Sequence, residues 1–201
     1  MPLGAFKAAL LGTAGATVAG DVVLLATTTA SSAASIEFTS GINSTYGEYI
    51  FRFYDMNPED TSRAAQLTVQ CSIDGGSNYN VVQTSSSFYA SHQEDDTDTA
   101  FPANSGMAQD TSTDNALTQT QGFGADESGA GEFHLFNPSS TTYVKHFHSE
   151  TNGVRDPAGV SAWTTHFFRS GYFNTTSAIN AIRFKMNSGD MDGKIKMWGV
   201  K

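Results

Sequence analysis

Residues 48–55 read EYIFRFYD, a stretch whose bulky side chains alternate along the chain. Successive side chains of an extended strand point to opposite faces, so Tyr49, Phe51 and Phe53 share one face. The opposite face is bulky as well. We therefore predict a β-strand here that is covered on both sides.

Period-two alternation recurs on either side of this stretch. Residues 66–73 form the clearest one-sided strand, with Leu67, Val69, Cys71 and Ile73 facing inward, and the turn residues Asp74-Gly75-Gly76 follow. No convincing amphipathic helix is present. Strands at this spacing predict an all-β fold, an antiparallel and jelly-roll-like β-sandwich. Further strands are expected at 21–30, 35–39, 132–136, 142–148, 161–168, 178–186 and 193–201.

The alternation is lost in the middle of the chain. We expect a single domain over residues 21–201, with a loop-rich insert at about 84–131 that holds one or two short strands. Loops this long are uncommon in a compact domain unless they are functional. The residues expected to form a receptor-facing loop are Phe88, Tyr89, Glu94, Asp95, Asp96 and Phe123.

The first twenty residues, MPLGAFKAALLGTAGATVAG, are apolar and rich in Ala and Gly. One interpretation is a secretory signal peptide, since Lys7 precedes an apolar stretch. We prefer a retained segment that packs against a neighbouring subunit, because Ala and Gly permit close backbone approach. Its assembly residues would be Leu3, Phe6, Leu10 and Leu11. A run of about 18 apolar residues, as a membrane-spanning helix needs, is missing.

Composition narrows the possible partners. The chain has 201 residues and a net charge of −9, and charged residues make up 15% of it, against roughly 25% in typical soluble proteins. An acidic chain is poorly suited to bind nucleic acid or an anionic lipid surface. Its one cysteine, Cys71, excludes an intrachain disulfide and is expected to be a small buried residue.

Charge is distributed unevenly along the chain. No Lys or Arg lies between Arg63 and Lys145, a window that contains many acids, and basic residues outnumber acids from Lys145 onward. One part of the surface is therefore expected to be acidic and another basic. Identical subunits could pair such patches; alternatively, an acidic loop simply stays solvated.

Two clusters have the residue types of a metal site. His146 and His148 project from one face of a predicted strand, and His134 of the previous strand would be the third ligand of a structural metal. The simpler interpretation is that these are ordinary surface or interface histidines. The run Glu94 to Asp98 could bind Ca²⁺, but it lacks the register of a calcium loop and also fits a solvated turn. No cofactor is expected otherwise.

No catalytic motif is present: the chain lacks a nucleophile elbow, a P-loop and a metalloprotease helix. We therefore expect a protein that is not an enzyme. Glycosidase chemistry needs only two carboxylates, so acids within 94–98 or 126–132 remain the candidates for a tail carbohydrate-degrading enzyme. The rings of Phe167, Phe168 and Trp198 are expected at a subunit contact, because Phe167 and Phe168 must point to opposite faces of one strand.

Two stretches carry a resemblance to a known family. The first comprises Ile42 to Tyr46 (INSTY), the aromatic strand and Ser72 to Tyr79 (SIDGGSNY). The second comprises Ala178 to Phe184 and the closing strand Gly193 to Lys201 (GKIKMWGVK). They resemble small virion proteins of tailed bacteriophages, of a kind common in marine and cyanobacterial phages. Those proteins also open with an apolar segment and close on a similar strand, in which Leu-Tyr stands at the place of Met197-Trp198.

The resemblance implies a jelly-roll-like, oligomeric and often trimeric protein without catalytic residues. We expect a non-enzymatic tail-associated module, in a fibre or tail tip, that is assembled in the host cytoplasm into the virion. Its partners would be copies of itself, other virion proteins and a host surface glycan or protein, bound through many weak contacts. The alternatives are a capsid decoration or head-fibre protein that stabilises the shell, and the carbohydrate-degrading enzyme named above.

Overall fold

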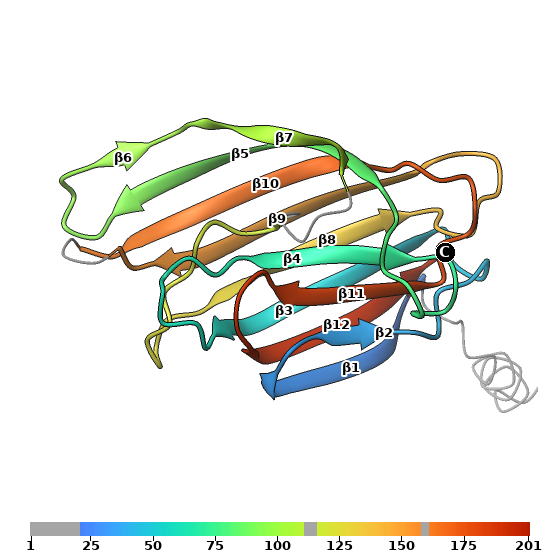
Figure 1. Cartoon of the computed structure of the whole chain (residues 1–201), viewed down its shortest axis with the longest axis horizontal. Helices are drawn as coiled ribbons and strands as arrows, with labels where there is room; N and C mark the ends of the chain where they lie inside the picture. The colour runs from blue at the N-terminus through green and yellow to red at the C-terminus, as the bar shows by residue number, and fades with distance from the viewer. Residues whose placement is uncertain (1–20, 111–115, 158–160) are drawn as a thin grey trace, which may run out of the picture.

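The fold is described by a computed structural model that covers residues 21–110, 116–157 and 161–201. These residues form strands and no helix, and the strands are arranged in two antiparallel sheets, one of nine strands and one of three (Figure 1). The prediction of an all-β, antiparallel fold is confirmed. In Figure 1 the small sheet lies in front of the lower half of the large sheet.

The strands of each sheet follow a defined spatial order. The small sheet runs β2 (Ile36–Phe38), β11 (Ala181–Met186) and β4 (Leu67–Ser72). The large sheet runs β1 (Val22–Ala33), β12 (Met191–Val200), β3 (Glu48–Pro58), β8 (Gly129–Phe136), β9 (Lys145–Arg155), β10 (Trp163–Phe173), β5 (Gln83–Gln93) and β6 (Thr99–Ala100), with β7 (Ala103–Asp110) also paired to β5.

Early strands pair with late strands in a nested pattern. β1 pairs with β12, β2 with β11 and β3 with β8, while β4 meets the later chain at an antiparallel bridge between Thr68 and Ala116. Successive members of this set alternate between the two sheets. Strands β9, β10, β5, β6 and β7 lie outside the nest and extend the large sheet beyond the small one (Figure 1).

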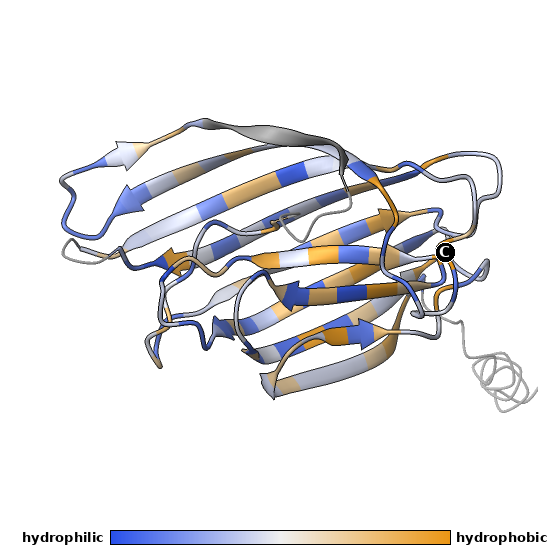
Figure 2. Ribbon diagram, in the orientation of Figure 1, coloured by the Kyte–Doolittle hydropathy of each residue, from blue (hydrophilic) through white to orange (hydrophobic). Residues whose placement is uncertain are grey.

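The core lies between the two sheets and is built mainly from aromatic rings. Phe184 of β11 is fully buried, and its ring centroid lies 5.2 Å from that of Phe51, 5.2 Å from that of Phe53 and 5.9 Å from that of Phe133. Apolar and polar residues alternate along β4, β11 and β12 (Figure 2). Burial of the apolar set between two layers is what holds the sheets together.

A β-bulge interrupts strand β3 near Asp55. Two residues of β3 oppose one residue on each neighbouring strand, and Asp55 has a φ of 53°. Before the bulge the buried side chains are those of Phe51 and Phe53, and after it the buried side chain is that of Met56, so the inward-facing positions shift by one residue. Gly193 lies opposite the bulge on β12, where an added Cβ would lie 2.9 Å from the carbonyl oxygen of Asp55. Glycine at this position makes room for the irregular backbone.

Three expectations from the sequence need correction. The stretch predicted to be long loops contains the eleven-residue strand β5 and the eight-residue strand β7. Strand β4 is not one-sided, since all six of its residues are buried. β3 is buried on one face only, because Arg52 is exposed on the other. Cys71 is buried as expected, and burial raises the pKa of its thiol.

Replacing Phe184 with Ala should lower the free energy of unfolding by about 3–5 kcal/mol, because it removes the ring shared by the two sheets. Tyr143→Ala is the matched control: this ring is 70% exposed, and its loss should change stability by less than about 0.5 kcal/mol. Denaturant titrations of the two variants measure both values. Equal effects would contradict a core centred on Phe184.

Candidate functional site

The candidate site is the face of the large sheet that points away from the small sheet, called here the open face. All five histidines of the chain project from it, although they come from four strands. The strand registers and the burial of the alternate residues, such as Phe147, Ser149 and Phe167, place them there. The five are His92, His134, His146, His148 and His166.

Two of these histidines stack at the middle of the face. His134 of β8 lies directly opposite His148 of β9, with ring centroids 4.4 Å apart and an interplanar angle of 14°. Nδ1 of His134 lies 2.5 Å from Oε1 of Glu48, and its Nε2 lies 3.1 Å from Oε1 of Glu132 without good hydrogen-bond alignment. His134 is therefore held between two carboxylates.

The surroundings of the stacked histidines change the pKa values of His148 and Glu132. Burial and the nearby charge of His134 lower the pKa of His148, although Glu48, Glu132 and Glu150 oppose the shift. Burial alone would raise the pKa of Glu132, but the close approach and charge of His134, together with Arg52, lower it overall. The cluster thus favours a carboxylate at Glu132 and a neutral ring at His148.

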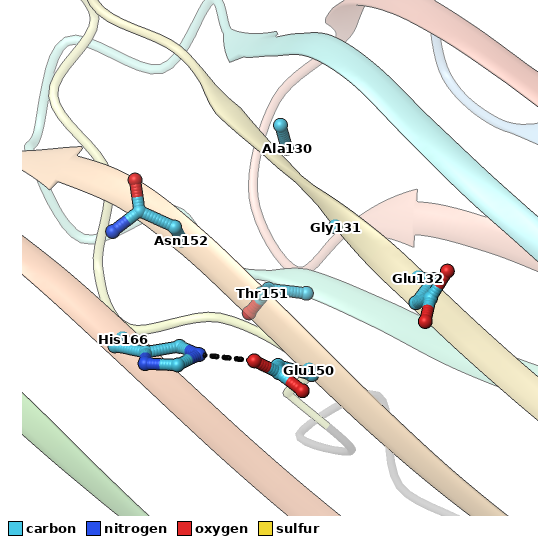
Figure 3. Close-up of a pocket in the computed structure, with 7 residues that line it drawn as sticks. All are labelled: Ala130, Gly131, Glu132, Glu150, Thr151, Asn152 and His166. Atoms are coloured by element: carbon cyan, nitrogen blue, oxygen red, sulfur yellow. Dashed lines mark hydrogen bonds and ion pairs between the residues drawn. The ribbon is translucent and has the colours of Figure 1, made fainter.

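A shallow hollow lies beside the histidine pair. It has a volume of about 410 Å³ and is lined by Ala130, Gly131, Glu132, Glu150, Thr151, Asn152 and His166 (Figure 3). Nε2 of His166 lies 2.8 Å from Oε1 of Glu150. Glu132 and Glu150 are direct cross-strand neighbours, an unfavourable pairing of like charges that Arg52 and the histidines offset.

Gly131 forms the floor of this hollow. Its φ is 154°, and an added Cβ would lie 2.3 Å from the carbonyl oxygen of Glu150. No side chain fits there without displacing the backbone of β9. Glycine at this position therefore allows β8 to approach β9 closely beside the hollow.

Aromatic rings gather on the open face where β10 meets β5. Phe88 stacks on Phe168 with centroids 4.9 Å apart, and Phe101 lies 5.8 Å from Phe88. His166 packs against Phe168 at 4.4 Å. A second hollow, of about 280 Å³, lies between these rings and His148. Phe88 is 42% exposed, so the cluster forms part of the accessible surface.

The opposite side of the open face is basic. Nζ of Lys196 lies 5.3 Å from the ring centroid of Tyr54, and the guanidinium of Arg52 lies 6.0 Å from the ring of Trp198. Nε of Arg52 also lies 3.3 Å from Oε2 of Glu132. Across strands β12, β3, β8 and β9 the face therefore changes from basic at Lys196 and Arg52 to acidic at Glu132 and Glu150, while Glu48 of β3 contacts His134 on the same face.

The structure brings together only part of the predicted metal triad. His134 and His148 meet, but as stacked rings, and His146 instead packs edge-on against Tyr172 with centroids 6.1 Å apart. Across residues 21–110, 116–157 and 161–201, no group of three His, Cys, Asp or Glu side chains is arranged to hold a metal ion.

In the acidic run Glu94 to Asp98, the Asp95 carboxylate accepts hydrogen bonds from the hydroxyl groups of Thr97 and Ser161, which lower the pKa of Asp95.

The predicted assembly residues have different environments. Phe167 and Phe168 do point to opposite faces, but Phe167 is 1% exposed within its own chain, so it needs no neighbouring subunit. Phe168 and Trp198 lie half-buried on the open face. Leu3, Phe6, Leu10 and Leu11 lie outside the described residues.

The predicted receptor-facing residues do not form one loop. Phe88 and Tyr89 belong to strand β5 and point to opposite faces. The exposed residues Glu94, Asp95 and Asp96 follow that strand in a turn. Oδ1 of Asp96 lies 3.0 Å from Nε2 of His92. Phe123 lies elsewhere, with its ring 5.0 Å from the guanidinium of Arg63.

Sequence reasoning did not predict Glu48, Glu150, Asn152 or His166 as site residues, and it named Glu132 only within the range 126–132 of acids considered for a glycosidase. The alternation of His146 and His148 along one strand placed both rings on one face, and the same alternation could have added Glu150. The strand order β8, β9, β10 could not be read from the sequence, so neither could the meeting of Glu150 with His166.

Comparisons with protein-family models, with curated proteins and with solved structures found no match to this chain. No helix within the described part of the chain is long and apolar enough to cross a membrane.

The lowered pKa of His148 makes a prediction about pH. The unfolded chain binds a proton at this ring near pH 6.5, whereas the folded chain binds it only at lower pH. Stability should therefore fall as the pH drops through this range. The variant His148→Gln should lose less stability than the parent between pH 7.5 and 5.5, as measured by urea titration. Parallel losses in both proteins would contradict this assignment.

Proposed function

We propose that this chain is a non-enzymatic structural module of a tailed-bacteriophage virion, associated with the tail and acting in several copies. The observation that carries the proposal is the position of the segments that resemble phage virion proteins. The closing strand is β12, which is paired on both sides, with β1 and with β3, in the large sheet. The shared motifs therefore build the framework and not a reaction centre.

The other shared motif is a turn with a structural role. The Asp74 carboxylate accepts hydrogen bonds from the Ser72 hydroxyl and from the backbone and side chain of Asn78, which lower the pKa of Asp74 to about 2. Gly75 and Gly76 both have positive φ, 74° and 93°. This local network explains the sequence SIDGGSNY without any ligand.

We further propose that the framework is a jelly roll, a fold found in viral capsid proteins. The nested pairs β1–β12, β2–β11 and β3–β8, with the bridge from β4 to Ala116, support this proposal. So does the alternation of successive strands between the two sheets. Strands β5–β7 and β9–β10 would then be insertions that widen one sheet of the roll and carry the histidines and exposed rings.

The open face would supply the contacts of the module with other virion proteins, with sister copies or with a host surface molecule. Its hollows are shallow, and its acids are engaged by His134, His166 and Arg52. Each such contact is weak alone, so attachment would depend on many copies acting together.

Copy number per particle tests this proposal. Quantitative mass spectrometry of purified virions that carry this gene should find the chain in small multiples of three or six for a tail module. Hundreds of copies would support the alternative of a capsid decoration protein. Absence from the particles, or release of sugar from host polysaccharide that depends on one acid of the chain, would overturn the proposal.

A further inference from the structure

We propose that the open face binds the open face of a second copy of this chain, through a two-fold axis that runs parallel to the strands above the boundary between β3 and β8. The inference deepens the proposed function, on which it rests for the premise that the chain acts in several copies.

The first argument is a row of charges across four neighbouring strands. Register pairs Lys196 of β12 with Arg52 of β3, Arg52 with Glu132 of β8, and Glu132 with Glu150 of β9. Lys194 adds to the basic end of the face. The row therefore reads basic, basic, acidic, acidic from one side to the other.

This order makes the face complementary to itself. A two-fold axis parallel to the strands exchanges the two ends of the row and keeps every residue at its level along the strands. Lys196 of one copy then lies opposite Glu150 of the other, and Arg52 lies opposite Glu132. An axis perpendicular to the strands would place β12 over β12, and like charges would meet. Charge complementarity therefore selects the parallel axis.

The neighbouring row brings apolar and aromatic groups together under the same symmetry. Trp198, Ile50, His134 and His148 follow one another across the same four strands. The indole of Trp198 would lie opposite the stacked histidine ring of His148, and Ile50 opposite His134. Leu24, 45% exposed beside Trp198, would lie opposite β10. These groups would lose water in the contact, which favours association.

The face is also large enough for a stable pair. Six neighbouring strands, spaced about 4.8 Å apart and about 35 Å long, offer roughly 1,000 Å² per copy. A typical specific interface buries about 800 Å² per partner. Two twisted sheets can pack in this way with their strands crossing at about 30°.

The charge pattern distinguishes a second copy from other occupants. A polyanion would meet the carboxylates of Glu132 and Glu150, and a polycation would meet Lys194, Lys196 and Arg52. A partner with one uniform charge is therefore repelled by half of the face. Only a partner with the reverse order of charges matches both halves, and the same face turned by the two-fold axis has that order.

Charge reversal in the full-length chain tests the pairing. In a dimer of Lys196→Glu chains, two Glu–Glu contacts replace the two proposed ion pairs between Lys196 and Glu150. In a dimer of Glu150→Lys chains, two Lys–Lys contacts replace the same ion pairs. Each variant alone should self-associate at least about tenfold more weakly than the parent in sedimentation experiments. A 1:1 mixture should recover parental affinity, because in the mixed pair every contact joins opposite charges again.

Lys185→Glu is the matched control, since it makes the same charge change on β11 of the small sheet and should leave self-association unchanged. Circular dichroism melts check that each variant is folded. The pairing is overturned if the parent stays monomeric up to about 100 µM, if it forms a three-fold assembly, or if the mixture does not recover affinity. A monomer that is still present in virions would overturn the pairing alone, whereas absence from virions would overturn the proposed function.

Discussion

The structure depends on the contact between Phe184 of the small sheet and the rings of Phe51, Phe53 and Phe133 on the large one. The strands of the small sheet are only three to six residues long, and burial of this ring cluster attaches the small sheet to the large one. Packing there uses only one face of the large sheet. The opposite face is left with the second set of alternating side chains, so the same contact that creates the core also creates the open face.

Much of this fold could be predicted from alternation. Strands β3, β11 and β12 have bulky inward residues and were expected within a few positions of their bounds. β5 was missed because it alternates small polar residues, such as Ser85 and Ser87, whose pattern carries no hydropathy signal. The bulge at Asp55 could not be foreseen, since it is accommodated by Gly193 of β12, which is distant from it in sequence.

The candidate site was predictable only within single strands. The spacing of His146 and His148 correctly placed both rings on one face, but it suggested ligands of a shared metal. Strand order decides which groups meet, and it brought His134 onto His148 as a stacked ring and Glu150 onto His166. The order of charges on the open face does not follow the segregation along the sequence, since Glu150 of β9 lies in the part where basic residues outnumber acids.

Strands β9, β10 and β5–β7 widen the large sheet well beyond what the small sheet covers. A sheet face that carries half-buried rings and a balanced row of charges is suited to a partner surface. The most direct measurement is the reactivity of individual histidines toward diethyl pyrocarbonate as protein concentration rises. We predict that His148 becomes protected on self-association while His92, at the far edge of the sheet, stays reactive. Constant reactivity of His148 in an associated sample would contradict burial of the open face.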